Sequence, residues 1–216
     1  MEITWYGHSC FRLTERSYAS VVTDPYDKKV VGYSDLKLKA DIVTVSHDAP
    51  GHNNTAAVKG TSHVIDGPGE FEIGSVFITG VATDGGSAKK KDNSSRNTVF
   101  VFDYNGITVA HLGDLKQVPT QSEVESLGTI NVALVPVGGG GGLNAAKAAE
   151  VISLIEPNIV IPMHHATPAA KIKLDPVNKF IKEMGLSKPE QQASLKLTRT
   201  GLPLETKVYV LEYQKS

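Results

Sequence analysis

Four side chains of the types that bind metal ions each follow an apolar run of residues, the pattern expected at the end of a strand. They are His47, His52, Asp114 and His164. Imidazole nitrogen and carboxylate oxygen suit Zn²⁺, Mn²⁺ or Fe. Three such ligands around an ion with an open position lower the pKa of bound water to about 7, which gives hydroxide at neutral pH. Together they favour a hydrolytic metal centre, although any one histidine alone is more often a packed, hydrogen-bonded residue.

The elements that must position these side chains are mostly short strands. Segments rich in β-branched and aromatic residues are separated by turn residues, which is typical of strands. They are 3–5, 10–13, 18–23, 42–45, 61–65, 76–79, 98–104, 107–111, 132–137 and 159–162. Asn105-Gly106 predicts a tight hairpin between two of them.

A helical period appears only late in the chain. Alanine and isoleucine recur at helical spacing over 145–155, with Asn144 as N-cap and Pro157 just beyond the end. A second helix is expected over 176–184, with Asp175 as N-cap. Many strands with few helices indicate two packed sheets with helices outside.

Length and composition predict one domain over residues 1–216. The chain is 40% hydrophobic and holds no linker or tandem repeat that would divide it. A net charge of −1 disfavours nucleic acid as a partner. The single cysteine, Cys10, forms no intramolecular disulfide, which fits a reducing compartment. Because the first residues lack the pattern of a signal peptide and no apolar stretch is long enough to span a bilayer, we expect a cytoplasmic protein without a membrane partner.

Two polar or glycine-rich segments permit more than one interpretation. Residues 84–95 include Lys89, Lys90 and Lys91 and predict a mobile loop, with a lysine clamp over an anionic substrate as the alternative. The glycines 138–142 predict a flexible turn, with an anion cradle at a helix N-terminus as the alternative. No Gly-Lys-Ser/Thr sequence follows them, which excludes a P-loop.

Several motifs, taken in order, resemble those of the metallo-β-lactamase fold, and within it the branch of ascorbate-6-phosphate-lactonase-like proteins. The motifs are Val45–His52, Ala110–Leu115, Leu134–Gly139 and Ile161–His164, with Gly7–Phe11, Thr23–Tyr26 and Arg96–Thr98 typical of the branch. The resemblance covers about residues 3–167. It implies a four-layer αββα sandwich with the site at one edge of the two sheets.

This chain departs from the metal motif of that family, which reads His-x-His-x-Asp-His. Here His47 and His52 are kept, but Ala49 stands at the second histidine and Gly51 at the aspartate. A further family histidine is expected soon after the strand that ends near residue 79, and no histidine occurs there before Asn97.

The missing ligands affect the two sites of the binuclear pattern unequally. The resemblance implies that the first site keeps only His47 and the shared Asp114, whereas the second keeps His52, Asp114 and His164. Three protein ligands match the number in catalytic mononuclear zinc sites. We therefore expect at most one ion, zinc, manganese or iron, or none.

Two functions follow from this pattern. In the first, His52, Asp114 and His164 hold one ion, a metal-bound hydroxide attacks an ester, lactone or phosphoester, and Asp114 and His47 act in catalysis, His47 by proton transfer. In the second, the chain is a catalytically inactive, metal-free module that binds a small ligand or regulates. A nuclease of the same fold is set aside, because the chain lacks a basic face and an inserted second domain.

Further residues are expected near the site. The resemblance implies a substrate contact or a supporting role for His8, Asp24 and Asn97, and Asp48 replaces the missing carboxylate only if its loop turns inward. His111 and His165 are expected to point away from the site. The expected partner is a small molecule, and an exposed edge or helix could support a homo-oligomer.

Overall fold

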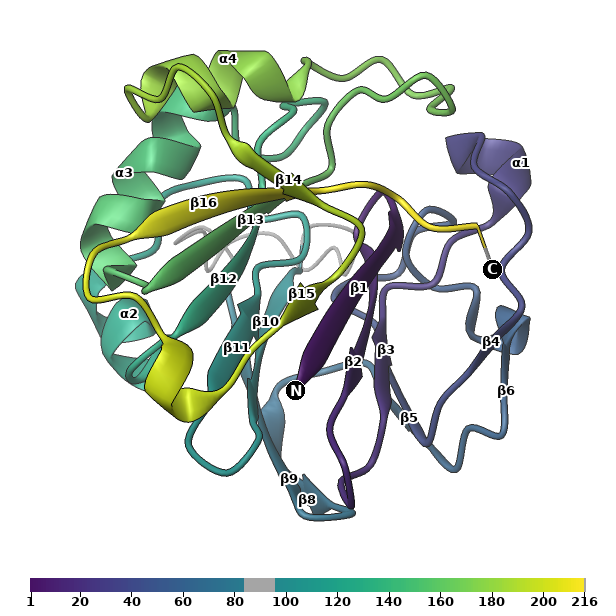
Figure 1. Cartoon of the computed structure of the whole chain (residues 1–216). Helices are drawn as coiled ribbons and strands as arrows, with labels where there is room; N and C mark the ends of the chain where they lie inside the picture. Colours follow the sequence, from purple (N-terminus) through teal and green to yellow (C-terminus); the bar gives the residue numbers. More distant parts are fainter. Residues whose placement is uncertain (84–95, 216) are drawn as a thin grey trace.

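The strands pair into two mixed sheets that face each other in the computed structural model, which describes residues 1–83 and 96–215 (Figure 1). The predicted loop over 84–95, with its lysines, therefore lies outside the described residues. The smaller sheet contains, in spatial order, β15 (Leu195–Lys196), β1 (Glu2–Gly7), β2 (Cys10–Thr14), β3 (Val21–Thr23), β5 (Ile42–Thr44) and β7 (His63–Ile65). The larger sheet contains β14 (Glu190–Gln192), β16 (Lys207–Leu211), β13 (Ile159–Met163), β12 (Val132–Pro136), β11 (Thr108–His111), β10 (Thr98–Asp103), β9 (Val76–Ala82) and β8 (Gly69–Ile73). A separate ribbon pairs β4 (Leu38–Lys39) with β6 (Val58–Lys59).

Helices cover the outer faces of the two sheets unequally. The helices α2 (Gln121–Leu127), α3 (Ala145–Ile155) and α4 (Val177–Glu183) lie over the larger sheet (Figure 1). Outside the smaller sheet lie the short helix α1 (Lys28–Val31) and the β4–β6 ribbon (Figure 1). The 3-10 turn Thr55–Ala57 and the segment that contains Ala169, Ala170 and Ile172 also pack there. The predicted αββα sandwich is confirmed, with one thin outer layer.

Apolar side chains form a separate cluster in each gap between layers. Trp5, Phe11, Phe100 and Phe102 are buried in the cluster between the two sheets. A second cluster joins the larger sheet to its helices, and a third covers the outer face of the smaller sheet. The packing of large side chains therefore holds the two sheets against each other.

Parallel strand pairs determine where the functional side chains gather. In the smaller sheet β3 is parallel to β5, and in the larger sheet β11, β12 and β13 are parallel neighbours. The carboxyl ends of parallel neighbours lie at the same edge of a sheet, and the loops that follow them meet there.

Several elements differ from the sequence prediction. The expected cap at Asp175 was wrong: Pro176 occupies the N-cap of α4, and the Asp175 carboxylate instead pairs with Lys179 at 2.6 Å. The helix begins at Val177, and Pro176 has the extended conformation of an N-cap. Asp175 therefore lies one residue before the N-cap position. The sequence prediction also omitted α1, α2 and the strands β4, β6, β8 and β14 to β16.

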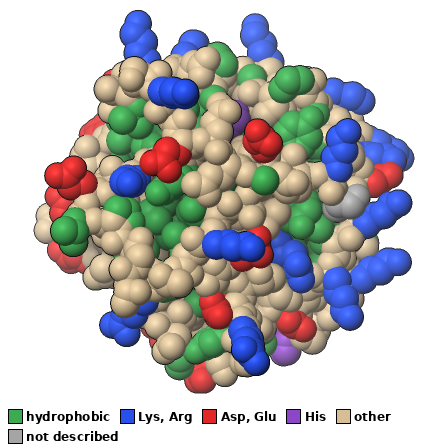
Figure 2. Space-filling view, in the orientation of Figure 1, with side chains coloured by type: hydrophobic (Ala, Val, Ile, Leu, Met, Phe, Trp, Pro, Cys, Tyr) green, Lys and Arg blue, Asp and Glu red, His purple; other side chains and the backbone are tan. Residues whose placement is uncertain are grey.

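The surface carries charges of both signs. On the face drawn in Figure 2, acidic and basic side chains are interspersed, and basic ones gather along the right edge, the side of α1, β4 and β6 in Figure 1. Within the described ranges, we find no helix with the length and apolar character needed to cross a membrane.

Candidate metal centre

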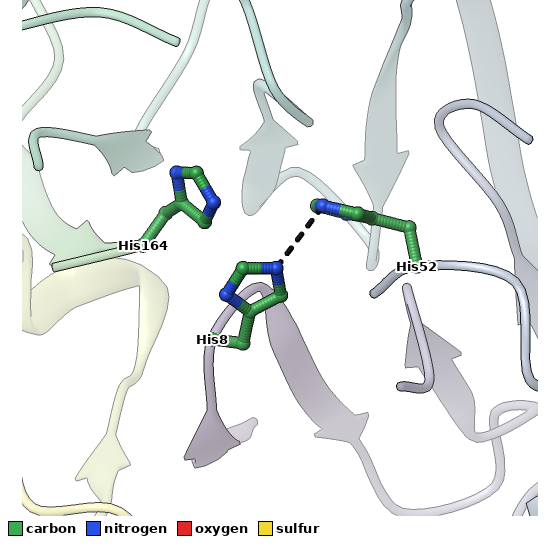
Figure 3. A group of neighbouring side chains, drawn as sticks. All are labelled: His8, His52 and His164. Atoms are coloured by element: carbon green, nitrogen blue, oxygen red, sulfur yellow. Dashed lines mark hydrogen bonds between the residues drawn. The ribbon is translucent and has the colours of Figure 1, made fainter. Parts of the chain in front are cut away.

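Three histidines from three different loops converge at the edge of the sandwich (Figure 3). His8 follows β1, His52 lies in the loop after β5, and His164 follows β13. All three are at least 96% buried, and His8 Nε2 lies 3.2 Å from His52 Nε2. The ring centres of His8 and His164 are 4.3 Å apart. Side chains of both sheets therefore share one small, enclosed space.

The backbone at this edge is held in an uncommon conformation. His8, Asp24 and His164 have φ angles of 52°, 40° and 51°, in the left-handed region that costs a non-glycine residue roughly 1–2 kcal/mol. The carbonyl oxygen of His8 accepts hydrogen bonds from the His164 backbone N–H and from Trp5 Nε1, each at 3.0 Å. Such conformations cluster at functional sites.

Asp24 fixes the orientation of the His52 ring. Its Oδ1 accepts a hydrogen bond from the Ser46 N–H at 2.7 Å, and its Oδ2 accepts from Ser46 Oγ at 2.6 Å and from His52 Nδ1 at 2.8 Å. Burial alone would raise the pKa of Asp24, but nearby His111 and the hydrogen bonds from His52 and Ser46 outweigh it and hold the pKa at about 2. Because this carboxylate is ionised, His52 Nδ1 donates, and His52 Nε2 presents a lone pair toward His8.

His47 is oriented through the same serine. Ser46 Oγ donates to Asp24, so it accepts from His47 Nδ1 at 2.9 Å and leaves His47 Nε2 as an acceptor. The ring centre of half-buried His47 lies 4.1 Å from that of His52. Burial, reinforced by His52, lowers the pKa of His47 to about 4, so this side chain is neutral at pH 7.

His8 and His164 are also neutral at pH 7. Burial and the neighbouring His52 lower the pKa of His164 to about 3. Burial, together with His164 and His52, lowers the pKa of His8 well below its usual value. A histidine must be neutral to offer a lone pair to a metal ion, so these environments suit ligands.

The chemistry of Asp114 and His164 fits a cation. Asp114 Oδ1 lies 3.5 Å from His164 Nδ1, and both atoms are buried without a hydrogen-bond partner among the described residues. Burial raises the pKa of Asp114. Because a buried polar atom left without a partner is costly, a positive ion between these groups and the neighbouring histidines would satisfy them.

Asn97 and two glycines position the residues around this pair. Asn97 Oδ1 accepts from the Asp114 N–H at 2.9 Å, and its Nδ2 donates to the carbonyl of Leu112 at 3.1 Å. A Cβ at Gly142 would lie 2.3 Å from Asp114 Oδ1, and one at Gly138 would lie 2.2 Å from the His164 carbonyl oxygen. The glycine run therefore has a steric reason, because its backbone packs directly on the site.

Two groups of three side chains bring possible ligand atoms within 4.8 Å of one another in the described part of the chain. One is His8, His52 and His164, and the other is Asp24, His47 and His52. The second group is already joined by hydrogen bonds, directly between His52 and Asp24 and through Ser46 between Asp24 and His47, so the first is the better candidate.

The expected ligand set is assembled only in part. Asp114 belongs to neither group, although it adjoins His164. His8, which the sequence placed beside the site, lies within it. Asp48 is exposed and bonds to Asn53, so its carboxylate is not turned toward the histidines. Sequence reasoning missed Ser46, although its position between a strand end and His47 was an available signal.

The remaining buried histidines make contacts of their own, although His165 Nε2 has no hydrogen-bond partner among the described residues. His111 Nε2 donates to the Ser9 carbonyl at 2.8 Å, and its Nδ1 accepts from the Gly113 N–H at 3.3 Å. The ring of His165 lies against Trp5, with ring centres 5.0 Å apart. Neither is a member of the three-histidine group.

Comparison with known proteins places this arrangement in a family. Residues 2–164, about three quarters of the chain, match the profile of the β-lactamase superfamily domain. The chain belongs to the β-lactamase superfamily. A metallo-β-lactamase superfamily member from Thermotoga maritima, described as a proposed zinc-dependent hydrolase, is 38% identical, with a TM-score of 0.79 over 99% of both chains.

More distant similarities are also found. A relative from Thermoplasma acidophilum, named a UPF0173 metal-dependent hydrolase, is 26% identical over 191 residues, which cover 77% of this chain and 84% of the relative. The structure of a metallo hydrolase from Ignicoccus hospitalis is 20% identical, with a TM-score of 0.64 over 99% of this chain and 96% of that one. The resemblance inferred from the motifs is therefore confirmed.

Proposed function

We propose that this chain is a metal-dependent hydrolase that binds one divalent cation among the converging histidines and cleaves an ester, lactone or phosphoester of a small molecule. The main support is the cluster itself: buried His8 and His164 are neutral at pH 7, and the partnerless atoms Asp114 Oδ1 and His164 Nδ1 adjoin them. The hydrolase names of the relatives from Thermotoga maritima and Thermoplasma acidophilum agree with this proposal.

The residues of the site have distinct tasks in this proposal. A bound divalent cation supplies Lewis acidity and lowers the pKa of water. Asp24 holds His52 so that Nε2 is directed into the site. Asp114, whose pKa is raised by burial, would accept at Oδ1 the proton that the attacking water loses.

In this proposal His47 supplies a proton to the leaving group. Its Nε2 is unprotonated because Nδ1 is held by Ser46, and its ring is half-buried, beside His52. A neutral imidazole between a buried site and solvent can take a proton on Nε2 and deliver it to a leaving oxygen.

Metal analysis tests the proposal. We expect about one zinc, manganese or iron per chain in protein purified without chelator or a metal-binding tag, and loss of that metal in His52→Ala. The exposed His63, whose side chain bonds only to neighbouring Ser62 among the described contacts, supplies the control His63→Ala. Hydrolysis of a panel of lactones and phosphoesters should follow the metal content.

A metal-free ligand-binding module is the second candidate. It is favoured by Ala49 and Gly51, which stand where the family motif has ligands. If the unmodified protein takes up no metal after dialysis against excess Zn²⁺ or Mn²⁺, the hydrolase proposal is wrong and this candidate takes its place. A thermal-shift screen of small molecules would then identify the ligand.

A further inference from the structure

The space next to Gly51 is filled by the ring of His8. Gly51 stands where the family motif has its aspartate. A Cβ built on Gly51 would lie 3.0 Å from His8 Nε2 and 3.4 Å from Val31 Cγ1. Gly51 does not have a positive φ, so its backbone conformation does not demand glycine. The tip of the His8 ring thus lies in the direction in which a side chain at position 51 would extend.

We propose that His8 replaces the missing aspartate, so that His8, His52 and His164 are the three protein ligands of a single zinc ion. The inference rests on the proposed function and specifies which side chains bind the metal. It differs from the expected set of His52, Asp114 and His164, because it gives the third position to His8.

The distances within the cluster suit this role. Two nitrogens that each lie about 2.1 Å from a tetrahedral zinc ion are about 3.4 Å apart. His8 Nε2 and His52 Nε2 are separated by 3.2 Å, and the rings of His8 and His164 adjoin each other (Figure 3). A small adjustment is enough for both Nε2 atoms to face one ion.

The backbone already ties the first and third ligands together. The His164 N–H donates to the His8 carbonyl at 3.0 Å, across the gap between the two sheets. His52 is fixed independently by Asp24. Ligands that are oriented before the ion binds lose little freedom on binding, which favours affinity.

Replacing a carboxylate by an imidazole also changes the preferred metal. A site of three neutral nitrogens favours Zn²⁺ over Mn²⁺, because Mn²⁺ prefers oxygen ligands. Three histidines with one open position are a known arrangement for catalytic zinc. Asp114, which adjoins His164 but stands outside the three-histidine group, then remains available as a base.

Removing the imidazole at position 8 and restoring the aspartate at position 51 tests the inference. The variants are His8→Ala, the double variant His8→Ala/Gly51→Asp, and the controls His52→Ala and His63→Ala. The zinc dissociation constant is measured by competition with a chromophoric chelator, and the visible spectrum of the Co²⁺-substituted protein reports the donor atoms. Thermal unfolding of the metal-free proteins verifies that each variant folds.

We expect His8→Ala to weaken zinc binding by about 100-fold or more, since loss of an outer partner of a ligand already costs 10–100-fold. The double variant should regain at least about tenfold of that loss, with a Co²⁺ spectrum altered by the new oxygen donor. If His8→Ala leaves the zinc affinity and the Co²⁺ spectrum unchanged, the proposed role of His8 is wrong. In that case, loss of zinc binding in His52→Ala would still support the proposed function. Absence of zinc binding by the unmodified protein would overturn both.

Discussion

Asp24→Asn should weaken metal binding while the chain still folds. In the native protein, the ionised carboxylate accepts hydrogen bonds from the Ser46 N–H, Ser46 Oγ and His52 Nδ1. In the variant, the amide oxygen can accept from the Ser46 N–H, and the amide NH₂ then faces Ser46 Oγ and His52 Nδ1. All these contacts survive only if His52 moves its proton from Nδ1 to Nε2. That tautomer directs an N–H, rather than a lone pair, toward His8.

The size of the effect follows from this conflict. To bind a metal ion, His52 must return its proton to Nδ1, where it faces the amide NH₂ as a buried donor without an acceptor. Such a group costs about 1–3 kcal/mol, which corresponds to roughly a 5- to 150-fold loss of affinity. That range overlaps the 10–100-fold found when outer partners of metal ligands are removed.

Two measurements check the reasoning. The zinc dissociation constant is obtained by chelator competition, and the His52 tautomer is read from ¹⁵N histidine NMR of the metal-free protein. Asp48→Asn is the matched control, because Asp48 is exposed on the same loop and should leave both observables unchanged. A dissociation constant within twofold of the native value, or a His52 that keeps its proton on Nδ1, would refute the argument.

Three further outcomes are expected. Gly142→Ala should lower zinc affinity at least about tenfold, because its Cβ would meet Asp114 Oδ1 at 2.3 Å and displace the carboxylate that adjoins the ligand His164. Gly67→Ala, whose Cβ would meet nothing within 4 Å, should leave the affinity unchanged. Burial lowers the pKa of His111 in the folded chain, so the unfolded chain binds a proton first as the pH falls. The free energy of unfolding should therefore decrease as the pH drops below about 6.5. Urea denaturation of the metal-free protein, with chelator present, should show a smaller decrease between pH 7 and pH 5 in His111→Gln than in the native chain. Thr120→Ala removes the capping box of α2 and should lower the free energy of unfolding in urea by about 1 kcal/mol; an unchanged urea midpoint would contradict this.

The regular elements were predictable where local signals agreed. The helix α3 begins after its Asn144 cap and ends before Pro157, as its period predicts. The helix α2 was missed although Thr120 and Glu123 form a capping box that the sequence displays. Strand β14 carries only polar residues and lies at the edge of the larger sheet, so it has no apolar alternation to reveal it.

The site was predictable only in outline. The rule that functional groups follow strand ends located His47, His52, Asp114 and His164, because that rule depends on local sequence alone. The burial of His8 inside the site depends on how closely the turn after β1 approaches the end of β13 in the other sheet. That approach is a property of the packed sandwich, which a single sequence does not display.

The three-histidine cluster joins parts of the molecule that belong to different layers. His8 and His52 are held by loops of the smaller sheet, and His164 by the turn that follows β13 of the larger one. An ion bound by all three would act as a cross-link between the sheets, and its bonds would have to break before the sheets separate. Saturation at 100 times the dissociation constant stabilises a folded chain by about 2.7 kcal/mol. If the link is already broken in the transition state for unfolding, the metal would stabilise the folded state but not the transition state, and it would therefore slow unfolding and lengthen the folded lifetime.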